Sequence, residues 1–398
     1  MIARRFSRHC DHRRRLPRLG VICALLAGCL AGCVSRPEAL PAAIATSGRP
    51  WGALQAPPDA PLHARSVLVL SGGGSNGAYG AGLLYGWSER GDRPDFDVVT
   101  GVSTGSLISP LAFLGSKYDE RLRDFYTSVK KEDIFRTRYW VAAPFKDSVF
   151  SAEPLEELLE NYITAEIIDE IAAEHRLGRR LYAGTTNLDT REFTIWDLGA
   201  IAASDRPDRA ERFRQVMRAS ASIPIAFEPV YFDVEHDGRR FWQMHVDGGA
   251  VGPVFVRHWM LGPRVTSASE ARQRQRDHGV YVILNLPLGI AAYTPPEAGL
   301  RSIGTASLET VNDAFNRVRL RTVADLARAH GYGFHYQAVP KDFENATNAL
   351  AFDPEHLSNL FEHGRAVIKG DRNSVVYGKC VRHWVDVGRR SIITENSQ

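Results

Sequence analysis

Short apolar runs that end at glycine-rich turns alternate with longer stretches of helical spacing along most of this chain. Apolar runs of about four to eight residues, rich in β-branched side chains, are typical of buried strands, and longer amphipathic stretches are typical of helices. Strands are predicted at residues 66–70, 96–100, 181–186, 193–198, 241–246, 280–286 and 333–339. Helices are predicted at residues 78–87, 106–114, 153–162, 165–175, 213–222, 302–330 and 354–369. We therefore expect one α/β domain with a central, mostly parallel sheet flanked by helices.

The predicted helix at residues 302–330 has an apolar face and a basic face. Its apolar positions recur at a spacing near 3.6 residues, as in a helix that packs on a core. These positions are Val311, Phe315, Val318, Leu320, Val323 and Leu326. The arginines on the other side are Arg317, Arg319, Arg321 and Arg328. Such a face either contacts anionic lipid head groups or is simply solvated, and the solvated face is the commoner of the two.

The first 32 residues have the pattern of an export signal. Seven arginines precede a small, almost wholly apolar stretch at residues 19–32, which is too short to remain as a membrane-spanning helix. Two consecutive copies of Leu-Ala-Gly-Cys end at Cys29 and Cys33. Each copy resembles the lipobox of bacterial lipoproteins, in which the cysteine is acylated, and an ordinary secretory signal is the alternative. Cys33 is favoured for lipidation because a polar, proline-containing stretch follows it, and Cys29 stays open.

Acylation of either cysteine would hold the protein on a membrane by its lipid chains. We therefore expect a lipid-anchored protein of the bacterial cell envelope that faces the periplasm. No feature of the sequence indicates an oligomeric state.

Composition divides the rest of the chain into three parts. Residues 33–65 are rich in proline and small residues and are expected to form a flexible tether. Residues 66–372 are long enough for one domain with a large core, and residues 373–398 form a C-terminal tail. Removal of residues 1–32 takes away seven arginines and Asp11, which changes the formal charge from +3 to −3. The remaining chain has no basic stripe for nucleic acid and no cysteine pattern for disulfides or a metal.

Gly101-Val102-Ser103-Thr104-Gly105 lies between a predicted strand and a predicted helix. In this G-x-S-x-G pattern the glycines allow a sharp turn that exposes the serine hydroxyl in a cleft. The helix that follows directs its free N–H groups toward charge that develops beside the serine. Ser103 is therefore the candidate nucleophile, although the short pattern also occurs by chance in loops.

A second glycine turn, at residues 71–77, follows the first predicted strand. Backbone N–H groups in such a turn bind anions. Gly72, Gly74 and Gly77 also fit a dinucleotide fingerprint, with Asp92, Asp95 and Asp97 near the expected ribose position. The P-loop interpretation fails because no Lys-Ser or Lys-Thr follows the glycines. An oxyanion hole is favoured, because parallel neighbouring strands place this turn and Ser103 at the same sheet edge.

Asp247, Gly248 and Gly249 end another apolar run. A glycine loop lets the backbone approach closely and can hold the carboxylate of Asp247 near another group. An ordinary Asp-Gly turn is the alternative. His245 precedes Asp247 by two residues and would share its strand face, so His245 is interpreted as structural.

The three blocks SGGGSNGAYG, GVSTG and DGG, in this order, resemble the signature blocks of the patatin-like phospholipase family. The resemblance continues through residues 183–187, 219–224 and 352–370. It implies a three-layer patatin-like fold and a lipid ester substrate. It also implies a dyad in which Ser103 attacks the ester and Asp247 takes its proton, with Gly72, Gly73 and Gly74 forming the oxyanion hole. Gly77, Gly101, Gly105, Gly248 and Gly249 would support these blocks, and no metal or other cofactor is implied.

One position departs from the family pattern. The family often has Arg or Lys before the last glycine of the first block, and this chain has Asn76. We therefore expect a preference for neutral or lyso-lipid esters. Two rivals stay open: a non-catalytic lipid-binding lipoprotein, and a Ser-His-Asp hydrolase whose histidine is one of His330, His335, His356 and His363.

Overall fold

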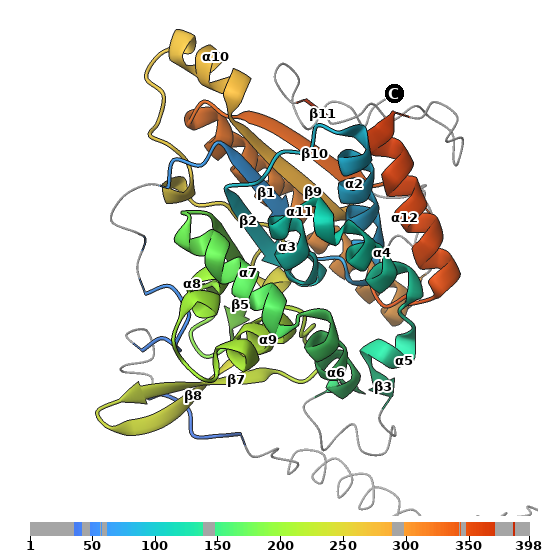
Figure 1. The fold of residues 1–398 in the computed structure, drawn as a ribbon. Coiled ribbons are helices and arrows are strands. Elements are labelled where there is room, and N and C mark those ends of the chain that lie inside the picture. Colours follow the sequence, from blue (N-terminus) through green and yellow to red (C-terminus); the bar gives the residue numbers. More distant parts are fainter. Residues whose placement is uncertain are drawn as a thin grey trace, which may run out of the picture.

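A mixed sheet runs through the middle of the molecule (Figure 1), in the strand order β11-β10-β9-β1-β2-β5-β8-β7, with β6 also paired to β5. This computed structural model describes residues 36–41, 48–55, 57, 62–137, 148–288, 298–341, 343, 348–370 and 385–386. The five central strands are parallel: β10 (Gly333–Val339), β9 (Gly279–Pro287), β1 (Ser66–Leu70), β2 (Val98–Val102) and β5 (Arg180–Asn187). Antiparallel strands complete the sheet: β6 (Glu192–Asp197), β7 (Val230–His236), β8 (Arg239–Asp247) and β11 (Val385–Asp386).

Two apolar cores lie on the two faces of this sheet, and β1 shows why. Successive side chains of a strand point to opposite faces. Leu68 and Leu70 join one core, and Val67 and Val69 join the other. The first core is covered by α2 (Gly77–Arg90), α3 (Thr104–Leu114), α4 (Asp119–Ser128), α6 (Glu153–Tyr162), α7 (Ala165–Arg176), α8 (Leu198–Ala203), α9 (Arg209–Ser220) and α12 (Pro354–Lys369). The second is covered by α11 (Leu300–Ala329) and residues 254–261.

These layers confirm the predicted α/β fold with helices on both faces of the sheet. The hydrophobic pattern did not predict α4, α8, β7 or β11. It also missed α5 (Lys131–Ile134), α10 (Ala268–Asp277) and a two-stranded sheet of β3 (Arg136–Thr137) and β4 (Phe150–Ser151). In Figure 1, α5, β3 and α6 lie together at one corner of the molecule.

The predicted helix at residues 302–330 is present as α11, but its expected apolar face is only half correct. Leu320 and Val323 are buried, whereas Val311 and Val318 are 64% and 62% exposed. Only the C-terminal half of α11 packs on the sheet, so the earlier positions of the stripe have no core to cover. Three of its arginines form ion pairs within the helix, as in a solvated face: Arg317, Arg321 and Arg328.

The described parts of the expected tether lie against the domain. Ala39 forms a bridge with Trp242 of β8, and Ala53 forms one with Trp196 of β6. Both terminal nitrogens of Arg36 donate to Asp189, at 2.6 and 3.0 Å. Of the expected tail, only β11 is described, and it pairs with β10. Residues 1–32 and both candidate acylation sites, Cys29 and Cys33, lie outside the described residues.

None of the helices that the structure describes combines the length and the apolar character needed to cross a bilayer.

Candidate active site

The strands β2 and β8 pair with the same edge of β5, and their ends meet there. The parallel strand β2 pairs with the first part of this edge and ends with Val102 opposite Gly184. The antiparallel strand β8 pairs with the next part and ends with Asp247 opposite Thr185. Since Ser103 follows Val102 directly, the two strand ends bring Ser103 to Asp247, and the interaction of the serine hydroxyl with the carboxylate lowers the pKa of Asp247.

Ser103 has a backbone conformation that is rare for a residue with a side chain. Its φ is 55° and its ψ is −128°, between the last residue of β2 and the first residue of α3. A positive φ at a non-glycine residue is uncommon, and strained residues persist where the surrounding structure fixes them. The carbonyl of Ser103 accepts the N–H of Ser106 at 2.8 Å. Ser103 is the N-cap residue of α3, and its side chain makes no capping hydrogen bond. This is the geometry expected of a nucleophile at a strand-to-helix elbow.

Asp247 is 5% exposed, and one of its oxygens accepts the N–H of Gly249 at 2.7 Å. Burial raises the pKa of Asp247 to about 6, although the hydrogen bonds from Ser103 and Gly249 oppose the rise. A carboxylate with a higher pKa is a stronger base toward a hydroxyl, and it is still ionised at neutral pH. The site therefore makes Asp247 a better proton acceptor than an exposed aspartate.

The glycine turn after β1 lies directly beside the serine. A Cβ added to Gly72 would stand 3.0 Å from the Cβ of Ser103. The N–H of Gly72 donates to Pro253 at 3.4 Å, and the N–H of Ser75 donates to Ala349 at 2.9 Å. Among the described residues, the N–H groups of Gly73 and Gly74 have no backbone acceptor. Of the three predicted oxyanion donors, these two therefore have free N–H groups.

Gly73 and Gly74 cannot be replaced without strain. Their φ angles are 150° and 57°, which side chains rarely allow. A Cβ would stand 1.8 Å from the carbonyl oxygen of Asn285 at Gly73 and 2.0 Å from that of Ala349 at Gly74. Four other predicted supporting glycines are also closely packed, with a neighbouring atom within 2.5 Å of an added Cβ: Gly77, Gly101, Gly105 and Gly248.

A small apolar pocket, the serine pocket, opens at Ser103. Its cavity volume is about 30 Å³, which is room for roughly two water molecules. Its walls come from the glycine turn, α3, α4, α5, α6, the segment after α9 and residues 349–352. The apolar side chains that line it include Leu107, Phe125, Ile134, Leu155, Ile223, Phe227, Leu350 and Phe352. Such a lining suits a hydrocarbon chain, which has to push side chains apart to enter.

The end of α9 and the residues after it hold Ser103 and Asp247 in place by hydrogen bonds. Ser220 accepts the N–H of Ser103 at 2.9 Å and donates to the carbonyl of Gly184 at 2.7 Å. The carbonyl of Ser222 accepts the N–H of Asp247 at 2.8 Å. Ser220 is fully buried, so both of its hydrogen bonds are shielded from water. Ser220 lies in the segment 219–224 of the family resemblance, but its local pattern predicts no such role, because buried serines at helix ends are common.

Asn285 of β9 holds the glycine turn in a similar way. Its N–H donates to the hydroxyl of Ser71 at 2.8 Å, and its side-chain amide donates to the carbonyl of Ser71 at 2.9 Å. Asn285 is fully buried. The hydrophobic pattern predicts the strand but not this role, which depends on β9 and β1 being neighbours.

His245 and the later histidines lie away from the serine. His245 is fully buried, its Nδ1 is 2.9 Å from the hydroxyl of Thr185, and its ring packs on Trp196 and Phe232. These contacts agree with the structural role predicted for it. None of the four rival candidates lines the serine pocket: His330, His335, His356 and His363.

The acidic residues of the dinucleotide interpretation are also misplaced. Asp97 accepts the N–H groups of Arg65 and Ser66, at 2.7 and 3.0 Å, at the start of β1. The glycine turn follows the other end of this strand, so Asp97 cannot serve a nucleotide bound there. Asp92 is paired with Arg90. In the part of the chain that the structure describes, no cluster of His, Cys, Asp and Glu has the arrangement of a metal site.

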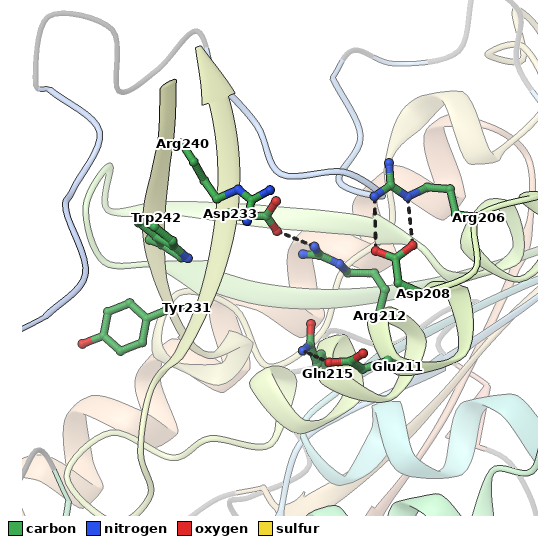
Figure 2. Close-up of a pocket in the computed structure, with 9 residues that line it drawn as sticks. All are labelled: Arg206, Asp208, Glu211, Arg212, Gln215, Tyr231, Asp233, Arg240 and Trp242. Carbon is green, nitrogen blue, oxygen red and sulfur yellow. Dashed lines mark hydrogen bonds and ion pairs between the residues drawn. The ribbon is translucent and has the colours of Figure 1, made fainter. Parts of the chain in front are cut away.

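A larger pocket, the polar hollow, lies between α9 and the hairpin of β7 and β8. Its volume is about 370 Å³, and Figure 2 shows its nine lining residues. Four of the charged groups form two ion pairs: Arg212 with Asp233 at 2.6 Å, and Arg206 with Asp208 at 3.0 Å. None of the lining residues belongs to the glycine turn or the dyad. We therefore assign the polar hollow no part in the chemistry of Ser103.

The fold and the site together define an α/β protein with a serine at a strand-to-helix elbow, a buried aspartate close to it, and a glycine turn beside the serine. Residues 68–258 match the family model described as patatin-like phospholipase. This region contains Ser103, Asp247 and the whole glycine turn. The chain thus carries a patatin-like phospholipase domain.

Among solved structures, the chain is similar to VipD from Legionella pneumophila, a crystal structure, with 11% sequence identity and a TM-score of 0.38. The similarity covers 75% of this chain and 67% of that one. No curated protein sequence matches the chain significantly.

Proposed function

We propose that this protein hydrolyses carboxylic esters of lipids through a dyad of Ser103 and Asp247. The observation that carries the proposal is the meeting of β2 and β8 on one edge of β5. It supports direct proton transfer from the serine hydroxyl to a buried carboxylate, beside a turn that still has free N–H groups. The match of residues 68–258 to the patatin-like phospholipase model supports the proposal, because this region contains both residues.

The reaction takes two steps of the same kind. As the Ser103 oxygen attacks the ester carbonyl, Asp247 accepts the hydroxyl proton. The N–H groups of Gly73 and Gly74 stabilise the negative charge on the former carbonyl oxygen. The ester C–O bond then breaks, and Asp247 returns the proton to the leaving alcohol. In the second step water attacks the acyl-enzyme and Asp247 accepts its proton; the bond between the acyl carbon and the Ser103 oxygen breaks, Asp247 returns the proton to that oxygen, and the fatty acid leaves.

Neutral or lyso-lipid esters are the substrates that we propose. Asn76 stands where the family often has a cation, and it is buried at the start of α2. The site therefore lacks a positive charge at this position for a phosphate. Turnover of a diacyl phospholipid should be compared with that of a monoacyl ester at equal concentration. A strong preference for the diacyl phospholipid would contradict the substrate proposal without affecting the dyad.

A lipid anchor at Cys33, or at Cys29, and a position facing the periplasm complete the proposal. Its support is the arginine-rich leader and the two lipobox copies in the sequence. Mass spectrometry of the mature N-terminal peptide would identify the acylated cysteine. An unmodified N-terminus with neither cysteine acylated would exclude the anchor.

The deciding experiment is hydrolysis of a p-nitrophenyl ester by the form that lacks residues 1–33, beside its Ser103→Ala and Asp247→Asn variants. We expect turnover that both substitutions abolish. Single replacement of His330, His335, His356 and His363 tests the Ser-His-Asp alternative, and one loss as complete as that of Ser103→Ala would favour it. Binding of lipid without any turnover would favour the non-catalytic lipoprotein.

A further inference from the structure

An exposed apolar patch lies at the rim of the serine pocket. It consists of Val149, Pro224 and Ile225, and we name it the rim patch. Ile225 is 79% exposed and Val149 is 39% exposed. The two residues are joined by backbone, because the N–H of Val149 donates to the carbonyl of Ile225 at 2.9 Å. Two segments far apart in the sequence thus present apolar side chains to solvent at one place.

The backbone at Ile225 is strained, which sets it apart from other exposed apolar residues. Its φ is 73°, and a positive φ at a β-branched residue is a genuine outlier. Single exposed apolar residues are common and need no explanation, whereas strain is retained at positions where it serves a function. Leu177 offers the contrast, since it is also 79% exposed but has an ordinary φ of −78° at the end of α7.

Apolar contacts continue from the rim patch down to the catalytic serine. Phe150 follows Val149, and its N–H donates to Ala226 at 2.9 Å. The rings of Phe135, Phe150 and Phe227 pack together, with centroids 4.4 to 6.2 Å apart. Phe227 lines the serine pocket together with Ser103. A hydrocarbon chain that leaves a lipid phase at the rim patch would therefore meet apolar side chains along its path.

We infer that the rim patch inserts into the surface of a lipid aggregate and delivers acyl chains to the serine pocket. The inference rests on the proposed hydrolase function and adds the surface from which the substrate comes. Apolar side chains at an interface gain free energy by leaving water, and Pro224 and Ile225 carry no charge that would oppose it. The strained turn keeps Ile225 exposed in the absence of lipid.

The test compares two esters with the same leaving group, one presented in vesicles and one in solution. p-Nitrophenyl palmitate is presented in phosphatidylcholine vesicles, and p-nitrophenyl butyrate is presented in solution, to the full chain and its variants. We expect Ile225→Ser to lower turnover in vesicles about tenfold, because the insertion energy of one large apolar side chain is lost. Turnover of the soluble ester should stay within about twofold, because the dyad is untouched. Val149→Ser should show the same pattern more weakly.

Two further variants separate insertion from folding and from general surface effects. Ile225→Gly relieves the strained φ, so it should melt at the same or a higher temperature and still lose turnover in vesicles. Leu177→Ser removes an equally exposed leucine elsewhere and should change neither activity. Equal effects of Ile225→Ser on both esters, or no effect on vesicles, would overturn the rim patch alone. If the unmodified chain hydrolyses neither ester, the proposed function fails and the inference falls with it.

Discussion

The serine pocket and the polar hollow differ in a way that size alone does not predict. The polar hollow is much larger, about 370 Å³ against about 30 Å³, yet four of its charged groups form two ion pairs with each other. The serine pocket is small and apolar, but it is lined by a strained serine and by Gly74, whose N–H has no backbone acceptor among the described residues, and a buried carboxylate with a raised pKa lies close to that serine. Backbone strain and a raised pKa, rather than open volume, distinguish the serine pocket from the polar hollow.

The largest loss of activity should come from substitutions in the dyad beside the serine pocket. Ser103→Ala and Asp247→Asn should each lower kcat/KM by about a thousandfold or more, because nucleophile and base act as a unit. Steady-state hydrolysis of a p-nitrophenyl ester measures the loss. The double variant should be no worse than either single variant. Losses that multiply in the double variant would show that the two residues act independently.

Substitution of Ser220 should lower activity less than substitution of the dyad, but more than substitution of an ordinary buried serine. Ser220→Ala leaves the N–H of Ser103 and the carbonyl of Gly184 without their buried partner, so the elbow is less well held. We expect kcat to fall about tenfold to a hundredfold with little change in KM. Ser109→Ala is the matched control, since Ser109 is fully buried and donates only to a carbonyl within α3. An equal loss of kcat in both variants would refute the positioning role of Ser220.

The pH dependence tests the electrostatics of the serine pocket. Only the ionised form of Asp247 accepts a proton, and its pKa is raised to about 6. The rate should therefore rise about tenfold per pH unit below 6 and level off above it. A plateau that begins near pH 4 would mean that Asp247 behaves as an exposed carboxylate.

The stability of the fold should depend on the same pKa, but it should fall with rising pH in the range where the rate rises. The folded state binds the Asp247 proton more tightly than the unfolded state, whose pKa is near 4. Stability from this group is therefore lost as the pH rises from about 4 through 6. Asp247→Asn removes this loss, so the variant should melt at a higher temperature than the wild type at pH 8. The advantage should shrink by pH 4, and an advantage independent of pH would contradict the argument.

The smallest effect on activity should come from the polar hollow. Arg212→Met removes a buried guanidinium that pairs with Asp233 and packs over the rings of Trp51 and Phe232. The partner carboxylate is 43% exposed, so we expect a loss of only about 1 to 2 kcal/mol in the free energy of unfolding. Activity should stay within about twofold of the wild type. Urea denaturation and ester hydrolysis measure the two quantities, and a large loss of kcat would give the polar hollow a catalytic role.

Much of the fold could be predicted from the sequence because each predicted element has a strong local signal. The apolar runs at residues 66–70 and 333–339 and the helix at 354–369 match β1, β10 and α12 in their bounds. Of the missed elements, α5, α8, β3, β4 and β11 are short and α10 lacks an apolar period, whereas α4 and β7 were missed although both are of ordinary length. Val311 and Val318 were misassigned because spacing shows which residues share a helix face but not how far the core extends beneath it.

The candidate site likewise contains residues that a local pattern predicts and residues that only tertiary contacts bring into place. Ser103, Asp247 and the glycines carry local sequence patterns that indicate close backbone approach. Ser220 and Asn285 have no such pattern, since their roles arise only when β2, β5 and β8, or β1 and β9, become neighbours. Residues 349–352 likewise reach the serine pocket only through tertiary packing.

Fluorophosphonate labelling tests the central claim, a serine nucleophile activated directly by Asp247, most directly. Intact-mass spectrometry should find one adduct on the wild type, mapped to Ser103 by peptide analysis. The Asp247→Asn variant should react far more slowly, and Ser103→Ala should not react. Labelling of Ser103→Ala at the rate of the wild type would contradict the account.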